Sequence, residues 1–408
     1  MKQFYIETVG CQMNVLDSEL ACSALLRAGL QQADSLADAD VILFNTCSVR
    51  QHAEDKVYSA LGRLKNWKEE KPYSVLGVLG CMAQKDQKLI FQRAPHVDFV
   101  LGPGRLDTLA ETVYKLLDDK ASHSTASPKK VCVSLPRTEN RPTDVIESYQ
   151  LYNPERTIQN NDSSSLVRIM FGCNQFCSYC IVPFVRGPEQ SRPPQDIISE
   201  VQHLAGQGVT TITLIGQTVN SYRYQEDKKH DGTQTRLADL LYRLSDITGI
   251  ERMDFVTNYP LGIDDDLLQA VRDLPQVSKH LHIPVQSGSD AVLKRMNRHY
   301  TAAQYRELTD RIYGTIPGAT MTSDFIVGFC GETDDDFEQT VELVKYCRFR
   351  NSFIFKYSPR PGTKAAELYA DDVPEDVKKY RNNRLLEVQI DISRQHTTES
   401  SNDLPSIH

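Results

Sequence analysis

Two successive alternations of strand-like and helical patterns fill most of this 408-residue chain, and this feature limits the possible folds most strongly. Strand-like segments rich in Val, Ile and Leu that alternate with helices are typical of parallel sheets covered on both faces. The first alternation covers residues 1–120 and the second covers residues 163–385. The sequence therefore predicts an α/β protein with two main domains.

The first alternation predicts an N-terminal domain built on a doubly wound parallel sheet. Its strand-like segments are Phe4–Thr8, Val41–Thr46, Ser74–Gly80 and Val97–Gly102. The helical patterns are Leu16–Ala28, Ala53–Lys68, Gln84–Arg93 and Leu106–Leu117. Residues 121–162 are rich in Ser, Thr, Asn, Pro and Lys, so we expect a linker there, with one added strand at Val131–Leu135.

The second alternation predicts a partial (β/α)6 barrel of the TIM type, because a complete barrel needs eight units. The six strand-like segments are Leu166–Gly172, Thr210–Gly216, Arg252–Thr257, Leu281–Gln286, Thr320–Val327 and Ser352–Tyr357. The helical patterns between them are Gln195–Ala205, Arg236–Leu244, Asp265–Leu274, Tyr305–Tyr313 and Asp335–Tyr346. Residues 386–408 are expected to hold the end of a helix that begins near Arg384, followed by a disordered polar tail from Thr397.

Composition indicates a soluble protein of the cytoplasm. Hydrophobic residues make up 40% of the chain and charged residues 25%, and no apolar run approaches the ~20 residues of a membrane span. The first residues enter a strand pattern directly, which leaves no room for a signal peptide. In the cytoplasm thiols stay reduced, so grouped cysteines indicate metal sites rather than disulfides. The net charge of −8 does not favour nucleic-acid binding, although a local basic surface is compatible with it.

Cys173, Cys177 and Cys180 form a CxxxCxxC group directly after the first strand of the second alternation. Loops after parallel strands open at the face where barrel active sites lie. Three thiolates can hold three irons of a 4Fe-4S cluster and leave the fourth iron open. The alternatives are buried cysteines or a structural zinc site, but zinc needs four ligands and residues 181–200 contain no Cys or His.

Cys11, Cys47 and Cys81 each follow a different strand of the first alternation. In a parallel sheet the residues after such strands share the carboxyl edge, where ligands usually bind. These cysteines are therefore candidates for a second three-ligand cluster. The alternative is that each is a small apolar residue at a strand end.

Several motifs resemble the methylthiotransferase family of the radical-SAM superfamily, where SAM is S-adenosylmethionine. They are Gly10-Cys11-Gln12-Met13-Asn14, Asn45-Thr46-Cys47-Ser48-Val49-Arg50, Gly80-Cys81, the Cys173–Cys180 loop, Arg186-Gly187 with Ser191-Arg192-Pro193, Gly216-Gln217-Thr218-Val219-Asn220, Pro284-Val285-Gln286-Ser287-Gly288-Ser289 and Asp324-Phe325-Ile326-Val327-Gly328-Phe329. The Gln-Met-Asn sequence resembles the MiaB-type branch, which acts on N6-dimethylallyladenosine in tRNA. The ribosomal-protein branch tends to have Pro-Lys-Asn there, and the threonylcarbamoyl-adenosine branch Lys-Val-Asn.

The resemblance implies an activity and its cofactors. It implies two 4Fe-4S clusters, a radical-SAM core at residues 163–385 and SAM as both radical source and methyl donor. The Cys173–Cys180 cluster would activate carbon 2 of the adenine next to the anticodon, and the cluster on Cys11, Cys47 and Cys81 would carry the sulfur. The implied partners are tRNA and a one-electron donor of the flavodoxin or ferredoxin type, and we expect a monomer.

Other functions remain open at this point. The same family includes enzymes that act on threonylcarbamoyl-adenosine in tRNA or on a ribosomal protein. A non-catalytic iron–sulfur regulatory protein could keep the fold, and a zinc-stabilised scaffold could keep the cysteines without a cluster.

Further candidates follow the barrel strands or lie in basic segments. Gln217, Asn220, Gln286 and Ser287 are expected to line the SAM or adenine pocket, although such residues also cap helices. Arg186 and Arg192 are either contacts to tRNA phosphates or solvated loop residues. The basic segment 294–299 is either a phosphate-binding face or a solvated helix surface.

The chain departs from the family pattern at three places. Cys330 occupies a position that is usually Pro, and Asn258-Tyr259-Pro260 replaces a common Ser-His-Pro. Family members also carry a C-terminal β-barrel RNA-binding (TRAM) domain, whereas nothing strand-like follows Ser393 here. Either the sequence is truncated or the two predicted domains hold tRNA alone. The acidic net charge predicts weak and salt-sensitive binding of tRNA.

Overall fold

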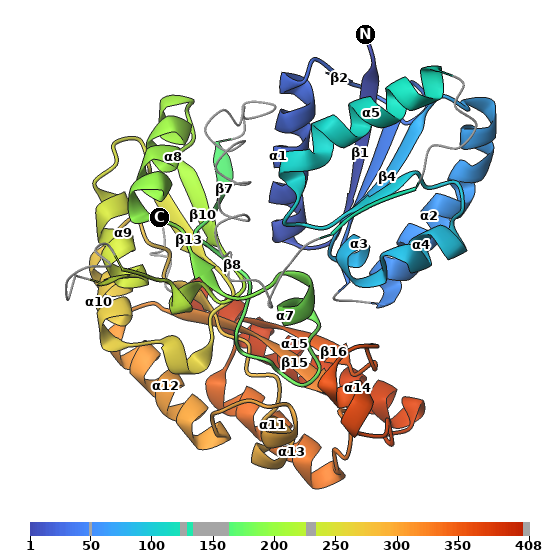
Figure 1. The fold of residues 1–408 in the computed structure, drawn as a ribbon. Coiled ribbons are helices and arrows are strands. Elements are labelled where there is room, and N and C mark those ends of the chain that lie inside the picture. Colours follow the sequence, from blue (N-terminus) through green and yellow to red (C-terminus); the bar gives the residue numbers. More distant parts are fainter. Residues whose placement is uncertain (49–50, 123–128, 134–162, 226–233, 403–408) are drawn as a thin grey trace. The chain divides into compact units, whose positions relative to one another are not determined.

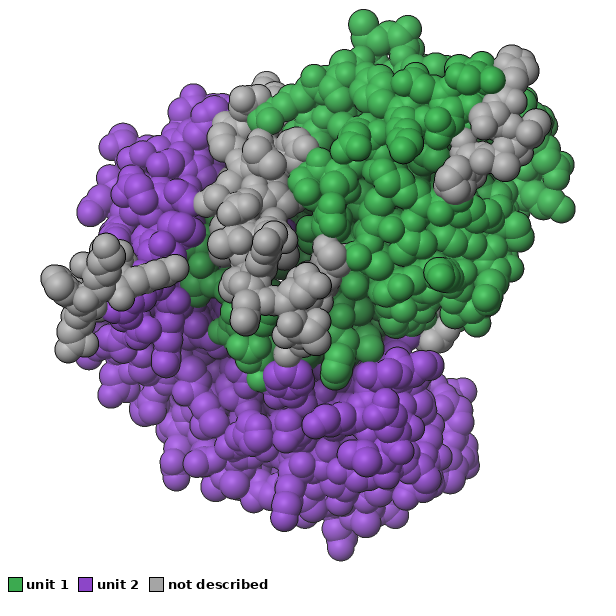
Figure 2. Space-filling model, in the orientation of Figure 1, with its two compact units in different colours: residues 1–162, 171–174, 181–192 green, residues 163–170, 175–180, 193–408 purple. Residues whose placement is uncertain are grey.

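The computed structural model describes residues 1–48, 51–122, 129–133, 163–225 and 234–402 (Figure 1). By its internal contacts the chain divides into two compact units (Figure 2). Unit 1 contains residues 1–162, 171–174 and 181–192, and unit 2 contains residues 163–170, 175–180 and 193–408. Of the helices described, none combines the length and the apolar character that crossing a bilayer requires.

Unit 1 is built on one six-stranded sheet in the order β2-β1-β3-β4-β5-β6, and every strand pair in it is parallel. The strands are β1 (Gln3–Val9), β2 (Gln31–Gln32), β3 (Val41–Thr46), β4 (Val75–Gly80), β5 (Phe99–Leu101) and β6 (Lys130–Cys132). All residues of β3 and β4 are buried, as expected for strands covered on both faces. The predicted doubly wound parallel sheet is confirmed.

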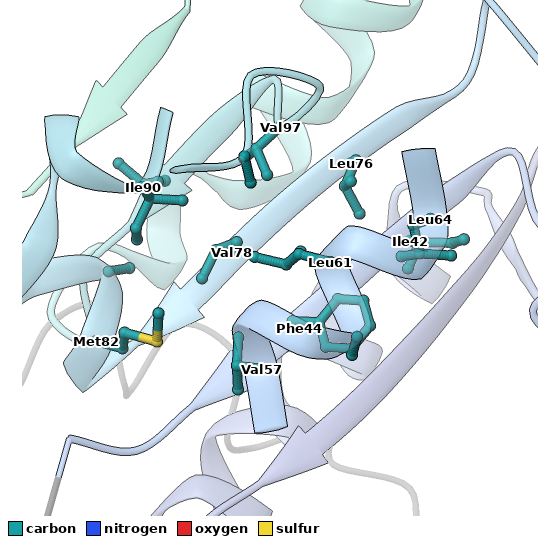
Figure 3. Close-up of a cluster of buried hydrophobic side chains, with 14 of the residues drawn as sticks. Ile42, Phe44, Val57, Leu61, Leu64, Leu76, Val78, Met82, Ile90 and Val97 are labelled. Carbon is teal, nitrogen blue, oxygen red and sulfur yellow. The ribbon is translucent and has the colours of Figure 1, made fainter. Parts of the chain in front are cut away.

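Helices cover both faces of this sheet (Figure 1). They are α1 (Gln12–Arg27), α2 (Gln51–Glu70), α3 (Cys81–Asp86), α4 (Lys88–Arg93), the 3-10 turn η1 (Leu106–Thr108) and α5 (Leu109–Ala121). The short α7 (Val182–Val185) contacts α3. On one face, Ile42, Phe44 and Val78 pack against side chains of α2, α3 and α4 (Figure 3). On the other face, α1 contacts β1 and β3, and α5 contacts β4.

Unit 2 contains the six predicted parallel strands in two three-stranded groups, ordered β13-β10-β7 and β14-β15-β16. Their bounds are β7 (Ser164–Arg168), β10 (Thr211–Ile215), β13 (Arg252–Phe255), β14 (His280–His282), β15 (Thr320–Val327) and β16 (Asn351–Lys356). A parallel bridge between Met253 and Val277 connects the two groups. This arrangement confirms the partial (β/α)6 barrel.

The helices of unit 2 follow the strands as a β/α series requires. They are α8 (Pro194–Gly206), α9 (Leu237–Ser245), α10 (Asp265–Asp273), α11 (Asp290–Arg295), α12 (Ala302–Thr315), α13 (Asp334–Cys347), α14 (Lys364–Leu368) and α15 (Glu375–Asn402). Smaller elements of unit 2 are η2 (Val219–Ser221), η3 (Pro260–Gly262) and the hairpin of β11 (Arg223–Gln225) with β12 (Gln234–Arg236). Strand β8 (Met170–Phe171) pairs with β9 (Gln190–Ser191), which belongs to unit 1. Thr301 and Thr333 cap α12 and α13 with capping boxes.

Two expectations about individual elements were wrong. The predicted helix over residues 84–93 is two helices, because Gln87 adopts a left-handed φ of 43° that ends α3. The strand expected in the linker is confirmed as β6, and it pairs with β5 as the edge of the unit 1 sheet. Helix α15 begins at Glu375 and reaches Asn402, so most of the expected disordered tail is helical, and residues 403–408 lie outside the described part.

Candidate functional site

The register of the unit 1 sheet places its three candidate cysteines after strand ends that lie side by side. Val9 at the end of β1 pairs with Thr46 at the end of β3, and Thr46 also pairs with Gly80 at the end of β4. Cys11, Cys47 and Cys81 follow these ends at the carboxyl edge of the sheet. Three cysteines that are far apart in sequence are therefore brought to one edge.

Two glycines allow the chain to turn tightly before these cysteines. A Cβ atom on Gly10 would lie 2.8 Å from the Cβ of Cys47, which shows how closely the two segments approach. Gly80 has a φ of 90°, and a Cβ there would lie 2.5 Å from Asn45 Oδ1 and 2.6 Å from the carbonyl oxygen of Thr46. Only glycine fits at Gly80 without strain and without a clash.

Two buried asparagines hold the segments of this site together. Asn14 Nδ2 donates to Asn45 Oδ1 and to the carbonyl of Thr46, both at 3.1 Å. Asn45 Nδ2 donates back to the carbonyl of Asn14 at 2.8 Å and to Ser18 Oγ at 2.9 Å. Cys11 Sγ donates to Asn14 Oδ1 at 3.3 Å. This network explains why both matched motifs contain an asparagine.

The thiols of this site interact electrostatically with one another and with Arg186. A hydrogen bond with Cys47 lowers the pKa of the Cys11 thiol to about 5, and the charge of Arg186 acts in the same direction against the effect of burial. Burial raises the pKa of Cys81, whereas the neighbouring Arg186 charge lowers it. A thiolate is the form that binds metal, so the site favours metal binding at Cys11.

Arg186 is itself buried in unit 1, with 8% of its surface exposed. Its Nε donates to Cys81 Sγ at 3.2 Å and its Nη2 donates to Asp17 Oδ2 at 2.8 Å. Both readings offered for Arg186 from the sequence, a tRNA phosphate contact or a solvated loop residue, are wrong. The same holds for Arg192, which is only 1% exposed, because a side chain enclosed by protein can meet neither phosphate nor bulk water.

The loop with the other three cysteines follows β7 and β8, and its residues are divided between the units. Cys173 belongs to unit 1, where its N–H donates to the carbonyl of Gly187 at 3.1 Å. Cys177 and Cys180 belong to unit 2 and are joined by one turn, in which the Cys180 N–H donates to the Cys177 carbonyl at 3.0 Å. Cys177 Sγ accepts a hydrogen bond from Arg298 Nη1 at 3.2 Å.

No three Cys, His, Asp or Glu side chains among the described residues are gathered closely enough to share a single metal ion. A structural zinc site requires four ligands on one ion. A 4Fe-4S cluster makes a different demand, because each thiolate binds its own iron and the sulfurs stay farther apart. Soft thiolates are also the ligands that such clusters use.

The polar candidates after the barrel strands have mixed surroundings. Asn220 exchanges two hydrogen bonds with the backbone of Tyr259, at 2.7 and 2.8 Å. Ser287 lies 3.3 Å from Thr340 Oγ1 and accepts from the N–H of Ser289. Gln286 has a left-handed φ of 76°, which is unusual for a non-glycine residue and is typical of strained positions near binding sites. Their assignment to a cofactor pocket, like that of Gln217, stays a prediction.

Two family models match the chain. One is described as Uncharacterized protein family UPF0004 and matches residues 3–102, and the other is the Radical SAM superfamily and matches residues 167–344. Together they cover both predicted domains.

Similar proteins and structures agree with these matches. A tRNA-2-methylthio-N(6)-dimethylallyladenosine synthase of Rhodopirellula baltica is 52% identical over 97% of this chain and 80% of its own length. A protein of the same name from Neisseria meningitidis serogroup A is 44% identical over 95% of this chain and 83% of its own length.

Among solved structures, the radical SAM methyltransferase TsrM of Kitasatospora setae has a TM-score of 0.59 at 13% identity and covers 90% of this chain and 77% of its own. The radical enzyme OxsB has a TM-score of 0.55 at 13% identity, with coverage of 94% and 56%. At this identity both support the fold alone. Given its two matched domains and its 52% identity to a relative of which it covers 80%, the chain belongs to the radical-SAM methylthiotransferase family.

Proposed function

We propose that the chain methylthiolates carbon 2 of N6-dimethylallyladenosine next to the anticodon of tRNA, on its 3′ side. The family uses SAM and two 4Fe-4S clusters, and relatives that bear the name of this activity are 44% and 52% identical over almost the whole chain. The Gln12-Met13-Asn14 sequence, typical of the branch that acts on this nucleoside, supports the same choice.

We assign one cluster to Cys173, Cys177 and Cys180, and the other to Cys11, Cys47 and Cys81. The observation that carries the second assignment is the alignment of the three strand ends in unit 1, because it brings three cysteines that are distant in sequence to one edge of the sheet. When bound, the clusters and SAM supply the one-electron chemistry that attack on an aromatic carbon–hydrogen bond requires. The protein supplies the thiolate ligands and the buried arginines that contact them.

The remaining assignments belong to the same proposal. Gln217, Asn220, Gln286 and Ser287 follow barrel strands, where substrates and cofactors usually bind. The partners are tRNA and an electron donor of the flavodoxin or ferredoxin type, and the enzyme acts as a monomer in the cytoplasm, where tRNA is modified.

Anaerobic counting of iron and sulfide tests the cluster assignment. The wild-type chain should hold about eight irons, and the Cys173/Cys177/Cys180→Ala variant and the Cys11/Cys47/Cys81→Ala variant should each hold about four. Zinc in place of iron and sulfide would support the scaffold alternative. An unchanged count in either variant would refute the corresponding cluster.

Nucleoside analysis tests the substrate. Cells that lack the gene should lose the 2-methylthio group from dimethylallyladenosine, and the intact gene should restore it where the triple-cysteine variants do not. Loss of the modified threonylcarbamoyl-adenosine, or of the modified ribosomal protein, would instead identify a sister branch. Iron-loaded protein that never cleaves SAM would indicate a regulatory protein.

A further inference from the structure

Arg298 is a buried arginine of unit 2 whose guanidinium group reaches one of the candidate ligands. Its Nη1 donates to Cys177 Sγ at 3.2 Å, its Nη2 to the carbonyl of Pro284 at 2.8 Å and its Nε to Tyr300 Oη at 2.7 Å. The guanidinium carbon also lies 4.7 Å from the centre of the Tyr259 ring. Among the described residues its partners are a sulfur, a carbonyl, a phenol and aromatic rings, and none is a carboxylate.

The end of α11, directly before Arg298, also holds the cysteine loop. The N–H of Ser178 donates to the Met296 carbonyl at 2.9 Å, and Ser178 Oγ donates to the Arg295 carbonyl at 2.8 Å. Asn297 Nδ2 donates to the carbonyl of Phe176 at 2.9 Å. The segment predicted as a phosphate-binding face or a solvated surface therefore fixes the backbone on both sides of Cys177.

Arg186 makes the corresponding contact in unit 1, with one difference. It also donates to a candidate ligand at 3.2 Å, in this case Cys81 Sγ, but its other nitrogen forms an ion pair with Asp17 at 2.8 Å. The side chains of this pair are only 6% and 3% exposed. The charge of Arg186 is thus balanced within the protein, whereas that of Arg298 is not balanced by any described carboxylate.

This difference has an electrostatic consequence for a cluster held by these thiolates. Reduction gives the cluster one electron from the external donor, so hydrogen bonds to its sulfurs and nearby positive charge favour the reduced form. The interaction is stronger inside a protein than in water, because the surroundings screen it less. A carboxylate beside the arginine cancels most of the effect of its charge.

We infer that Arg298 is a positioning residue that fixes Cys177 and makes the cluster of its loop easier to reduce. Arg186 positions Cys81 and changes the potential of its own cluster less, because Asp17 neutralises it. This inference rests on the cluster assignment proposed above and adds a role for residues outside the cysteine motifs.

Redox titration of the full chain, followed by electron paramagnetic resonance, tests the inference. The Cys11/Cys47/Cys81→Ala background isolates the cluster of the Cys173–Cys180 loop, and the reductant is dithionite with mediators. In this background Arg298→Gln keeps an N–H donor but loses the charge. It should lower the ratio of reduced to oxidised cluster about tenfold at fixed potential, which is about 59 mV for one electron.

Two further variants separate charge from structure. Arg298→Lys keeps the charge and should stay closer to the wild-type ratio than Arg298→Gln. Arg272→Gln removes an exposed arginine of α10 and should leave the ratio unchanged. The inference would be overturned if the ratio of reduced to oxidised cluster were the same with Arg298→Gln as with Arg298 intact in this background.

The opposite background, Cys173/Cys177/Cys180→Ala, provides a test with the reverse sign. Asp17→Asn keeps an acceptor oxygen for Arg186 but removes the balancing charge, so it should raise the ratio of reduced to oxidised cluster. A purely structural role for the pair predicts no rise, and that result would overturn the electrostatic part of the inference. If neither cysteine group held iron in the wild-type chain, the proposed function would be refuted, and this inference with it. Iron in both loops with no shift in these variants would refute this inference alone.

Discussion

Unit 1 assembles its cysteine site from three separate strands, whereas two of the three cysteines in the other site belong to a single turn of unit 2. In unit 1, the pairing of Val9 with Thr46 and of Thr46 with Gly80 sets which residues meet. In unit 2, the spacing of Cys177 and Cys180 already places them close together, and the end of α11 then holds the turn. The site in unit 1 depends on sheet register. The other site depends on local sequence and on hydrogen bonds from the end of α11, which is distant in sequence.

The two sites should therefore lose their metal-binding geometry through different kinds of change. A site made by register is exposed to any change that shifts a strand end or unbalances the charge buried beside it. A site made by a local turn should tolerate single substitutions better. The chain itself fixes the spacing of its cysteines, and each hydrogen bond from the end of α11 contributes only part of the stability of the turn.

The largest expected effect comes from breaking the buried ion pair of unit 1. Asp17→Ala leaves Arg186 buried without its counter-charge and should reduce the free energy of unfolding of unit 1 by about 3–5 kcal/mol. Trp67, the only tryptophan, lies in the unit 1 core, so its fluorescence in urea reports this unit alone. Asp273→Ala removes the exposed partner of Arg272 and should not change the Trp67 transition. A shift below 1 kcal/mol for Asp17→Ala would show that unit 1 does not depend on the pair.

The next effect tests whether register builds the site. Gly80→Ala combines a left-handed φ with a Cβ placed 2.5 Å from Asn45 Oδ1 and should cost about 2–4 kcal/mol. Gly29→Ala is a matched control with the same φ of 90° but no atom closer than 3.7 Å, so it should cost only about 1–2 kcal/mol. Iron counting should show loss of the unit 1 cluster in Gly80→Ala alone. Equal iron contents in the two variants would contradict the prediction that sheet register builds the unit 1 site.

Both cysteine groups could be predicted from the sequence. The spacing of Cys173, Cys177 and Cys180 and the strand-then-cysteine pattern predicted both groups, because these signals are local or follow from parallel topology. The two sheets were predicted for the same reason, since buried strands and helices leave periodic apolar patterns.

Arg298 could not be predicted in the same way. It lies 121 positions after Cys177, and its neighbours read as a basic surface segment. Charge alone does not show whether an arginine faces water or a sulfur, and only packing decides this. Arg186 was assigned to solvent or tRNA for the same reason. Its partner Asp17 lies within a helix pattern, and nothing in the sequence indicates that the two side chains form an ion pair.

A buried carboxylate in unit 2 gives a pH-dependent effect of intermediate size. Burial raises the pKa of Glu332 to about 7, from a usual value of 4.5, although the nearby Arg381 opposes the shift. Between these two pH values the folded state binds more protons than the unfolded state, so stability falls as pH rises. The stability of the wild type minus that of Glu332→Gln should therefore fall by up to about 3 kcal/mol between pH 4.5 and 8. Denaturation followed by tyrosine circular dichroism measures it, and parallel curves for the two proteins would contradict the expectation.

The smallest effect tests whether the turn in unit 2 keeps its cluster when one hydrogen bond is lost. Ser178→Ala removes one side-chain hydrogen bond to the Arg295 carbonyl, while the backbone bond from Ser178 to Met296 remains, so the loss should be about 1 kcal/mol. Hydrogen exchange of the amides at residues 176–180 should quicken slightly, and the iron content should not change. Ser245→Ala, which removes an exposed bond within one helix, should leave that exchange as it is.

Suppose that Ser178→Ala lost the cluster of the Cys173–Cys180 loop as fully as Gly80→Ala is expected to lose the unit 1 cluster. That result would mean that the spacing of the cysteines alone does not preserve the turn. The hydrogen bonds from the end of α11 would then be as decisive for this site as sheet register is for the site in unit 1. Retained iron, with faster exchange confined to the turn, would instead show that the spacing of Cys177 and Cys180 suffices for binding and that α11 only restrains the loop.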